Sequence, residues 1–557
     1  MEFLEQFISF MNNLLAYPLI FFLLGTGVWL TLRLGFVQFR RLGHGLRVTM
    51  GKYDNDDSKP GDVSHFQALT TALSATVGIG NIAGVAIAIH WGGPGALFWM
   101  WMTALLGMAT KYSEVTLAQH FRQELGTDDR AGSVAGGPMY YIEHGLGKNW
   151  KPVAMFFAFM LMITSFMTGN AIQANTVATQ MYANFGIATW ITGLITAGLV
   201  GIVIIGGIKR IGKVTSILAP TMAAIYVLGA LIIIGSDIGG AFSAFGTIFS
   251  EAFNPTSGVA GTGIGVFLMT MQRGVQRGLF SNEAGQGSAP IAHSAAKTDE
   301  PVSEGVVALL EPFIDTLIIC TLTGIVVVST GVWNDKFETT LELSDGNISY
   351  VVGDTDAGFS STDTPESLQF VDGHEVNAGS DTPQMAYFDI PVDQLFTDAE
   401  QTQPFEGTLY PEDRRADNAA GGSVEVLYGQ AARSSSPLTS LGFERGLEPL
   451  GLGWLGRYIV LICVLMFALS TAISWSYYGD RCANYLWGKK AILPYKFVFV
   501  LMHFLGAIVA VTTIWDLGDV ALSLVTIPNV IALFMLSGLV KTLTDKYFDE
   551  KPWEKKS

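Results

Sequence analysis

The chain has 557 residues, of which 50% are hydrophobic and 14% charged, whereas roughly a quarter of the residues in an ordinary soluble domain are charged. This composition excludes a soluble enzyme of that length. The formal net charge of −16 comes from one segment, because residues 332–450 hold 22 acidic and 5 basic residues and the rest of the chain holds 26 and 27. A basic surface for nucleic acid is therefore not predicted.

Apolar stretches long enough to cross about 30 Å of hydrocarbon recur along the chain. We predict eleven membrane-spanning helices, at residues 14–34, 64–90, 95–120, 152–183, 188–207, 213–235, 259–280, 305–331, 455–478, 495–514 and 520–540. The sequence thus divides into helices one to eight (1–331), an acidic insertion (332–450), and helices nine to eleven with a C-terminal tail (451–557). Short β-like runs between turn residues predict that the insertion is a small β-rich domain.

Lysine and arginine mark the cytoplasmic ends of membrane helices. They follow helix one at Arg40, Arg41 and Arg47, whereas the connections 90–94, 184–186, 236–258 and 515–519 contain none. This distribution predicts a multi-pass protein of a bacterial-type plasma (inner) membrane, with its N-terminus and the insertion outside and its C-terminus in the cytoplasm. The first ten residues lack the pattern of a removable signal peptide.

The second predicted helix contains the most informative stretch, residues 73–84, with the sequence LSATVGIGNIAG. Two glycines stand between Thr76 and Asn81 in the middle of the span. An interrupted helix is tolerated at that depth only where it lines a polar cavity, and it can direct amides at a carboxylate and carbonyls at a cation. The alternative is close helix packing through the G-xxx-G spacing of Gly80 and Gly84.

Two motifs resemble known transporters. Residues 77–81 (VGIGN) resemble the unwound first core helix of sodium-coupled transporters with the LeuT-type fold, and residues 277–290 (RGLFSNEAGQGSAP) are similar to the signature of the alanine or glycine:cation symporter (sodium:alanine symporter) family. The resemblance covers residues 20–331 and 450–540 and leaves the insertion unexplained. It implies an all-α polytopic membrane protein, with a 5+5 inverted repeat preceded by one extra helix.

The resemblance also implies a cation site. The main-chain carbonyls of Ser74 and Val77 would supply two ligands, and the hydroxyls of Ser470 and Thr471 two more. Oxygen ligands suit a hard cation such as Na⁺, by extension of the rule for divalent cations. The alternative for the two hydroxyls is a hydrogen bond to carbonyls of their own helix.

A second cation position is implied at Asn81 and the Thr76 carbonyl, with the substrate carboxylate as a further ligand. The amides of Ile79 and Gly80 would hold that carboxylate, because freed N–H groups at the start of a half-helix carry partial positive charge. Binding of substrate and cation would then be coupled directly.

Helix four carries Gly169, Asn170 and Gln173 within one turn of an apolar stretch. Buried amides must be paired, so the two amides bind either the substrate or neighbouring helices. Trp475 lies one turn after the predicted cation-binding hydroxyls and would form the wall of a small pocket, or else pack against lipid or a neighbour. By analogy with the broken sixth core helix, helix seven would contribute Met269, Thr270 and Gln272.

The remaining intramembrane charges have a structural and a functional interpretation. Helices seven and eight carry four of them towards the cytoplasmic side: Arg273, Arg277, Glu311 and Asp315. We expect ion pairs that hold an inner gate. The functional alternative is a proton relay. Lys111 and Glu114, three residues apart, are expected to form an intrahelical pair. The eight histidines show no metal-ligand spacing.

These features predict a secondary transporter, not an enzyme, that imports alanine or glycine with Na⁺ by alternating access. The expected partners are the amino acid, Na⁺ and the lipid bilayer, without an organic cofactor. The alternative is another LeuT-fold symporter for a small solute, driven by H⁺. A channel would need a ring-like selectivity filter, and a membrane enzyme would need a nucleophile with a base or a metal cluster. The sequence contains neither pattern.

Overall fold

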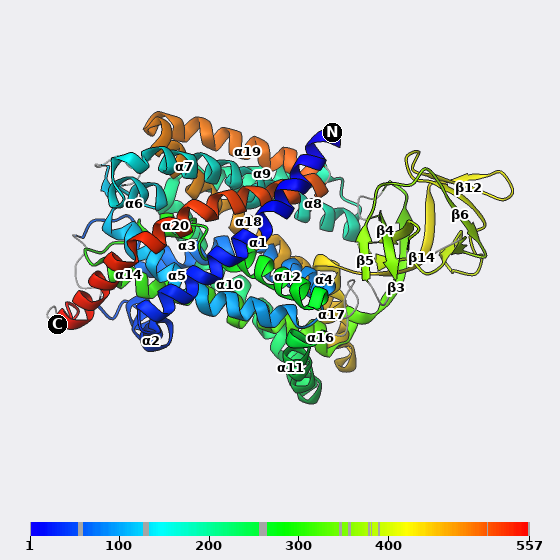
Figure 1. Ribbon diagram of the computed structural model, residues 1–557, viewed down its shortest axis with the longest axis horizontal. Coiled ribbons are helices and arrows are strands. Elements are labelled where there is room, and N and C mark those ends of the chain that lie inside the picture. The colour runs from blue at the N-terminus through cyan, green and yellow to red at the C-terminus, as the bar shows by residue number, and fades with distance from the viewer. Residues whose placement is uncertain are drawn as a thin grey trace.

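The computed structural model describes residues 2–53, 59–125, 133–255, 264–344, 348–354, 358–376, 379, 381–387, 390–509 and 511–554. Most of them lie in long helices that run side by side, and a smaller part built of strands projects from one end of this helical part (Figure 1). The chain begins near the end that carries the strands and finishes at the opposite end. This placement agrees with the predicted relation between the two termini and the insertion.

Helices form almost all of the chain before and after the strand-rich part. The first set is α1 (Glu2–Arg33), α2 (Val37–Thr49), α3 (His65–Thr76), η1 (Gly80–Gly84), α4 (Val85–Gly92), α5 (Ala96–His120), α6 (Pro138–Gly145), η2 (Lys148–Trp150), α7 (Lys151–Phe166), η3 (Met167–Ala171), α8 (Ile172–Phe185), α9 (Thr189–Ile204), α10 (Gly207–Ser236), α11 (Ile238–Phe253), α12 (Ile264–Asn282), α13 (Ala289–His293), α14 (Pro301–Ala308), α15 (Leu310–Pro312), η4 (Phe313–Cys320), α16 (Thr321–Ser329) and η5 (Val332–Asn334). The second set is α17 (Ser435–Leu447), η6 (Glu448–Leu450), α18 (Gly453–Trp487), η7 (Lys489–Ala491), α19 (Ile492–Ile508) and α20 (Val511–Glu550).

Six helices in the described part of the chain are long and apolar enough to cross a membrane, or eight spans if each of two bent pairs counts as one. The chain is therefore a multi-pass membrane protein. All eleven predicted stretches coincide with helices, including the shorter or more polar α5, α9 and α12, and the count of eleven spans stays a prediction. Residues 259–263 of the seventh stretch lie outside the described residues. The last boundary was predicted too late, because α19 ends at Ile508 and α20 begins at Val511.

The connection predicted at residues 236–258 contains a helix, α11, rather than a simple turn. Asp237 begins it by accepting a hydrogen bond from the amide of Gly240 at 2.8 Å. Phenylalanines recur along α11, and Phe242, Phe249 and Phe253 are exposed. These aromatic side chains recur at the helical period, a pattern that favours a helix. This pattern accounts for α11 within the connection.

The first interrupted helix lies where the glycines predict it. The helix α3 begins with a capping box, in which Ser64 and Gln67 each bind the other's main-chain amide. It ends at Thr76, and the chain resumes as η1 and α4 at an angle of 51°. The π-helical turn η1 leaves main-chain groups without their usual partners, so side chains of other helices can bind them.

A second interruption separates α12 from α13. Glu283, Gly285 and Gly287 all have positive φ angles, of 55°, 89° and 77°, and glycine adopts such angles without strain. This turn falls within the motif 277–290. The carbonyl and amide groups of a second membrane helix are therefore also freed, near the middle of the chain.

The two interrupted helices run antiparallel and touch along their length. A Cβ atom on Gly92, at the end of α4, would lie 3.2 Å from the Cα atom of Thr270. A Cβ atom on Gly80 would lie 3.1 Å from the Phe280 ring and 3.3 Å from the Cα atom of Ser281. The first break therefore faces the last turn of α12, immediately before the second break.

The described residues of the insertion form three small antiparallel sheets. Their strands are β3 (Lys336–Glu342), β4 (Ile348–Asp354), β5 (Gly358–Ser361), β6 (Leu368–Val371), β7 (His374–Glu375), β8 (Gln384–Tyr387), β9 (Ile390–Pro391), β10 (Leu395–Phe396), β11 (Gly407–Tyr410), β12 (Arg415–Asn418), β13 (Ser423–Val424) and β14 (Val426–Ala432), ordered β10-β14-β3, β13-β12-β11-β6-β7 and β5-β4-β8-β9. A separate pair, β1 (Gln123–Glu124) and β2 (Val134–Ala135), lies between α5 and α6. The insertion has its own apolar core, which includes Leu341, Phe370 and Phe405, as expected for a domain with independent packing.

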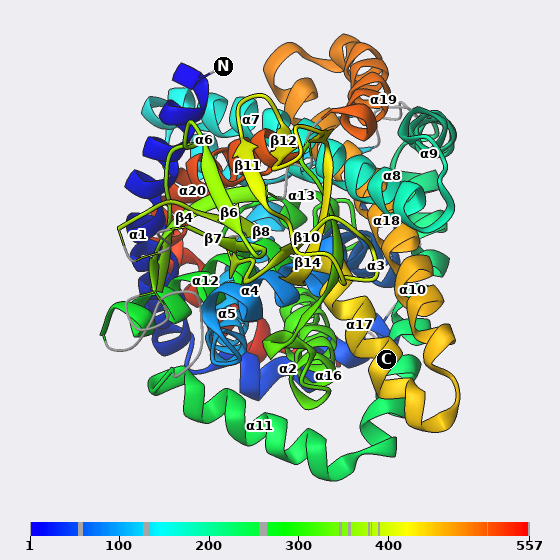
Figure 2. The same ribbon diagram turned by 90° about the vertical axis from the view of Figure 1, so that its right-hand side faces the viewer.

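The last part of the insertion belongs to the helical body. The helix α17 packs along α18 and against η1 (Figure 2), and the hydroxyl of Thr439 donates to the carbonyl of Ile82 at 2.9 Å. The strand-rich part itself runs only from Lys336 to Ala432, and these two residues lie opposite each other in the β3–β14 pair.

This register yields a deletion test. Residues paired across antiparallel strands have Cα atoms about 5 Å apart, so three glycine or serine residues should replace 337–431 without moving the helices. We expect the shortened protein to purify as a single species with an unchanged midpoint of thermal unfolding for the helical part. Extending the deletion through residue 447 should lower that midpoint, because it removes the contact of α17 with the first break. Equal loss in both deletions would contradict the boundary.

Candidate functional site

The main-chain groups at the first break form hydrogen bonds with the asparagine of the break and with hydroxyls from other helices. Asn81 accepts a hydrogen bond from the amide of Gly78 at 2.8 Å. Its carbonyl accepts from Thr323 of α16 at 2.8 Å, in the same way that Ile82 accepts from α17. All these groups are buried, and buried main-chain groups need such partners. Ile79 and Gly80, the predicted carboxylate-binding residues, lie within this turn and are buried.

The residues of the first predicted cation site lie together. Thr471 Oγ1 lies 3.1 Å from the carbonyl oxygen of Ser74 and 3.3 Å from that of Ala75. Ser470 Oγ lies 3.3 Å from the Ser74 oxygen and 2.9 Å from the carbonyl of Phe467 in its own helix. The Ser470 hydroxyl therefore contacts one carbonyl of its own helix and one carbonyl of α3, so a hydrogen bond within α18 is only one of its two carbonyl contacts.

Close contact with the Thr471 side chain explains why residue 78 is a glycine. A Cβ atom on Gly78 would lie 2.6 Å from Thr471 Oγ1, whereas a Cβ atom on Gly84 would meet nothing within 4 Å. Gly80 packs closely on α12, but Gly84 does not, so the G-xxx-G alternative accounts for one of its two glycines. Val77 is buried at the end of α3, and Thr76 places its hydroxyl 3.3 Å from the carbonyl of Ala72.

The second predicted cation site contains a carboxylate that the sequence interpretation placed elsewhere. The Asn81 amide lies 2.6 Å from Asp315 Oδ1, and Ser281 Oγ lies 2.7 Å from Asp315 Oδ2. Asp315 is completely buried. Its role in an inner ion pair with arginine was therefore wrong. Its position on an intramembrane helix was the signal for a functional residue, and Ser281 falls within the motif 277–290.

The expected pair of Lys111 with Glu114 is also wrong. Glu311 Oε1 lies 2.9 Å from Lys111 Nζ, so Lys111 does not pair with Glu114 within its helix. Instead, Glu114 accepts from the side-chain amide of Asn529 at 2.6 Å. The two arginines stand over aromatic rings, Arg273 over Trp91 at 4.9 Å and Arg277 over Phe280 at 5.5 Å.

The second break brings a further carboxylate to the predicted substrate pocket. Trp475 Nε1 donates to Glu283 Oε1 at 3.0 Å, and Ser288 donates to the other Glu283 oxygen. The indole packs so closely on the main chain of Gly169 that a Cβ atom there would lie 2.3 Å from it. Gly169 and Trp475 therefore come together as predicted for a pocket wall, but Glu283 was missed, although it lies within the motif 277–290.

The two amides of helix four differ in their surroundings. Asn170 donates to the carbonyl of Phe499 at 2.7 Å, and its oxygen contacts the imidazole of His503 at 2.6 Å, so it joins η3 to α19. Gln173 donates to the Thr168 carbonyl at 3.1 Å, while its buried Oε1 has no hydrogen-bond partner among the described residues. Gln173 thus keeps an acceptor available, and Asn170 does not.

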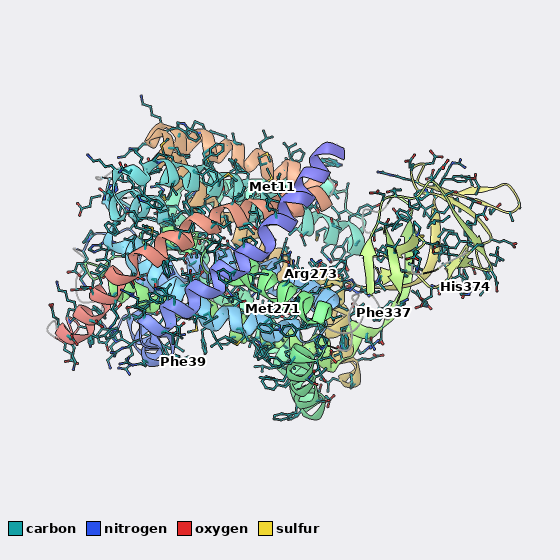
Figure 3. The ribbon with its side chains drawn as sticks, viewed as in Figure 1. Met11, Phe39, Met271, Arg273, Phe337 and His374 are labelled. Atoms are coloured by element: carbon teal, nitrogen blue, oxygen red, sulfur yellow. The ribbon has the colours of Figure 1, made fainter. Side chains whose placement is uncertain are left out.

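The three predicted residues of helix seven lie away from both breaks. Thr270 is buried against Gly92, at the far end of α4, and Met269 and Gln272 flank it. Figure 3 places the neighbouring Arg273 on the part of α12 that points towards the strand-rich part. Eleven residues of helix separate Thr270 from Ser281, which is about 16 Å. The structure brings Ser281 and Glu283, rather than residues 269–272, to the first break and the pocket.

Comparison with known proteins shows similarity along nearly the whole chain. The sequence profile of the sodium:alanine symporter family matches residues 1–362 and 425–557. The sodium/alanine symporter AgcS of Methanococcus maripaludis is 38% identical over 554 residues, covering 98% of each chain. An uncharacterized transporter of Haemophilus influenzae is 36% identical, covering 98% of this chain and 96% of its own.

Two further matches are a curated relative and a solved structure. The probable sodium/glutamine symporter GlnT of Bacillus subtilis is 30% identical, covering 99% of this chain and 92% of its own. The structure of MhsT in complex with L-phenylalanine superposes with a TM-score of 0.48 at 13% identity, covering 87% of this chain and 99% of its own.

Interrupted helices with polar groups at their breaks are typical of ion-coupled secondary transporters. The chain belongs to the sodium:alanine symporter family. It is a cation-coupled amino-acid symporter and not an enzyme. The expectation that the likeness ends at residue 331 was too narrow, because the profile includes 332–362 and 425–450, and the similarity to AgcS extends through the insertion.

The contact between Gly78 and Thr471 yields a test of the first cation site. Replacing Gly78 with alanine should displace the Thr471 hydroxyl and raise the Na⁺ concentration for half-maximal binding about tenfold, or about 1.4 kcal/mol. Isothermal titration of the purified protein with NaCl measures the change. The Gly84→Ala variant is the matched control and should bind Na⁺ as the parent does. A similar loss in both variants would indicate a general packing defect.

Proposed function

We propose that this protein imports a small neutral amino acid, alanine or glycine, together with Na⁺ by alternating access. The observation that carries the proposal is the meeting of the Ser470 and Thr471 hydroxyls with the carbonyl of Ser74 at a broken helix. Four oxygens, completed by the Val77 carbonyl, would surround a desolvated monovalent cation. Such a site can form only while α18 lies against α3, so cation binding would stabilise that arrangement.

The positions of the breaks support the LeuT-type inverted repeat. If each interrupted helix counts as one span, the breaks fall in the second and seventh of the eleven predicted spans, five spans apart, and the two helices are antiparallel. Two repeats of five helices with opposite orientation, preceded by α1, would produce this arrangement. The glycines around each break are natural hinges for the motion between outward and inward states.

A second Na⁺ would bind between Asn81, Ser281 and Asp315, with the Thr76 carbonyl nearby. The Asn81 side-chain nitrogen donates to Asp315, and its oxygen accepts from the Gly78 amide. The cation would therefore bind the Asp315 carboxylate and the Ser281 hydroxyl first, and the Asn81 oxygen would join them only after releasing the Gly78 amide. A carboxylate adds strong attraction for a monovalent cation at a buried position. The substrate carboxylate, held by the amides of Ile79 and Gly80, would complete the coordination and couple the two ligands.

The substrate itself would lie beside the wall that Gly169 and Trp475 form together, within reach of Gln173. Its ammonium group needs acceptors, which the unpartnered Gln173 oxygen and the Glu283 carboxylate provide. The buried Trp475 indole would limit the space for the substrate side chain, which favours alanine and glycine over glutamine, although one relative is a probable glutamine symporter. Asn170 would position η3 rather than contact substrate, and Met269, Thr270 and Gln272 would lie outside the pocket.

We place the protein in a bacterial-type plasma (inner) membrane with its N-terminus and strand-rich part outside and its C-terminus in the cytoplasm. The shared end of the N-terminus and the strands supports this orientation (Figure 1), as does the concentration of basic residues in the opposite connections. Import would then draw on the inward Na⁺ gradient.

Uptake of labelled alanine into proteoliposomes tests the proposal. With an inward Na⁺ gradient we expect uptake that glycine inhibits and glutamine does not, and replacing Na⁺ with K⁺ should abolish it. Thr471→Ala should reduce uptake about tenfold or more at limiting Na⁺, whereas Ser476→Ala is the control, because its buried hydroxyl bonds to Ile473 in its own helix. Uptake driven equally by a proton gradient without Na⁺ would refute the coupling.

Asp315 offers a separate test of the second cation. Asp315→Asn removes a buried negative charge but keeps the shape of the side chain, so the Na⁺ concentration for half-maximal uptake should rise about tenfold or more. The dependence of uptake on Na⁺ should also become less steep, because one of two ions is lost. Asp545→Asn, which removes an exposed charge paired with Lys541, is expected to leave both measurements unchanged. An unchanged Na⁺ dependence in Asp315→Asn would exclude this site.

A further inference from the structure

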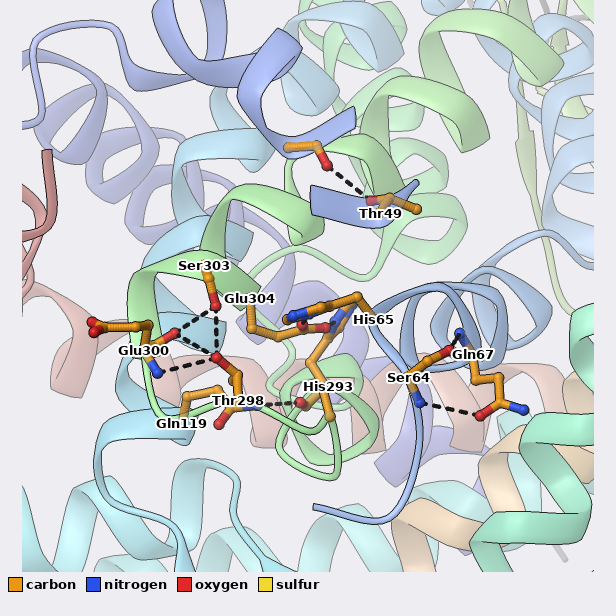
Figure 4. A network of polar contacts seen from close by, with 12 residues as sticks. Thr49, Ser64, His65, Gln67, Gln119, His293, Thr298, Glu300, Ser303 and Glu304 are labelled. Atoms are coloured by element: carbon orange, nitrogen blue, oxygen red, sulfur yellow. Dashed lines mark hydrogen bonds and ion pairs between the residues drawn. The ribbon is translucent and has the colours of Figure 1, made fainter. Parts of the chain in front are cut away.

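A buried carboxylate joins the two half-helices on the side of the breaks away from the strand-rich part. Glu304 of α14 contacts His65, the first residue of α3, through one oxygen and His293, the last residue of α13, through the other. Figure 4 shows both imidazole rings turned towards this carboxylate. The His293 Nδ1 to Glu304 Oε1 distance is 2.5 Å. We name these three residues the clasp.

The surroundings hold the clasp in position. Gln119 donates to the His293 carbonyl at 2.6 Å, which holds the end of α13 against α5. The hydroxyls of Thr298 and Ser303 contact each other at 2.9 Å at the start of α14. Both ends of the loop between α13 and α14 are therefore held, and the Glu304 side chain is completely buried.

The clasp continues into a second ion pair. His293 Nε2 lies 3.6 Å from Glu311 Oε2, and the other oxygen of Glu311 lies 2.9 Å from Lys111 Nζ. Both ring nitrogens of His293 thus face carboxylate oxygens. The Nδ1 contact is a hydrogen bond, whereas the Nε2 contact at 3.6 Å is close enough for an ion pair but not for a hydrogen bond. Two carboxylates on opposite sides of the ring therefore favour a positive charge on it, as in an imidazolium.

The charges of the cluster lead to the same assignment. Two carboxylates, Glu304 and Glu311, face one ammonium group, Lys111, and an uncompensated charge at a buried site costs several kcal/mol. One protonated histidine makes the group neutral. Three further charges lie nearby, Glu114 and Glu283 beside Lys111 and Arg122 beside Glu304, and their net charge of −1 also favours a proton. Asp315 lies one turn beyond Glu311 on the cation site.

We propose that His293 holds a resident proton between Glu304 and Glu311, and that this proton keeps α3 and α13 clasped to α14. Loss of the proton would leave an unbalanced negative charge buried among four elements, so the half-helices would separate more readily at alkaline pH. The consequence for transport rests on the proposed function, in which these half-helices border the path from both cation sites to the cytoplasm.

Hydrogen exchange of the purified full-length protein, without Na⁺ or amino acid, tests the clasp independently of transport. After correction for the intrinsic pH dependence of exchange, we expect protection of peptides from 65–76 and 289–296 to fall about tenfold or more between pH 6.5 and 9.5. In Glu304→Gln the cluster is neutral without the proton and the amide can bond both histidines, so protection should not change with pH. Asp299→Asn, which removes an exposed acid of the same loop that pairs with Lys59, should follow the parent protein.

Two further variants keep the test decisive if Glu304→Gln does not fold. His65→Gln retains His293 and both carboxylates, so the pH dependence should persist. His293→Gln removes the proton site, so protection should be low at every pH. Constant protection in the parent protein, or a parental pH profile in Glu304→Gln or His293→Gln, would overturn the proposal. Failure of Na⁺-driven alanine uptake would not, because exchange is measured without either ligand.

Discussion

The need to pair every main-chain group in a membrane shapes the centre of this protein. Two helices are interrupted, and each interruption frees carbonyl and amide groups that lipid cannot bind. The structure meets this need with side chains from helices distant in sequence. Asn81 accepts from the Gly78 amide, while threonines of α16, α17 and α18 donate to the carbonyls around the break. The same polar groups that satisfy the backbone create the candidate cation site.

Charged residues follow a related rule. Glu283, Asp315, Glu304 and Glu311 are almost completely buried, and each contacts several polar partners, because desolvating a carboxylate is costly without them. Glu283 lies at the second break, Asp315 contacts the first break, and Glu304 and Glu311 contact His293 at the end of α13. Buried polar contacts are thus concentrated around the interrupted helices. Apolar side chains pack most of the remaining helical body.

Much of the architecture was accessible from sequence, because hydropathy and helix length respond to the same bilayer. The positions of the helices, the break at residues 77–81 and the β-rich insertion followed from local patterns. The resemblance supplied Ser470 and Thr471, which lie next to Ser74 although almost 400 residues separate them in the chain. The break of helix seven falls at residues 283–287, after the three residues assigned to that helix, because the analogy did not indicate where within the helix the chain is interrupted.

The sequence by itself determined which segments enter the membrane and which residues interrupt them, since these depend on hydropathy, glycine and charge within short windows. Only the tertiary structure decided the partners of the buried charges. Lys111 is three residues from Glu114 yet pairs with Glu311, and Asp315 is one turn from Glu311 yet faces Asn81. Ion pairing depends on which helix faces lie within a few ångströms of each other, and that distance is set by the packing of the whole bundle rather than by spacing along the chain.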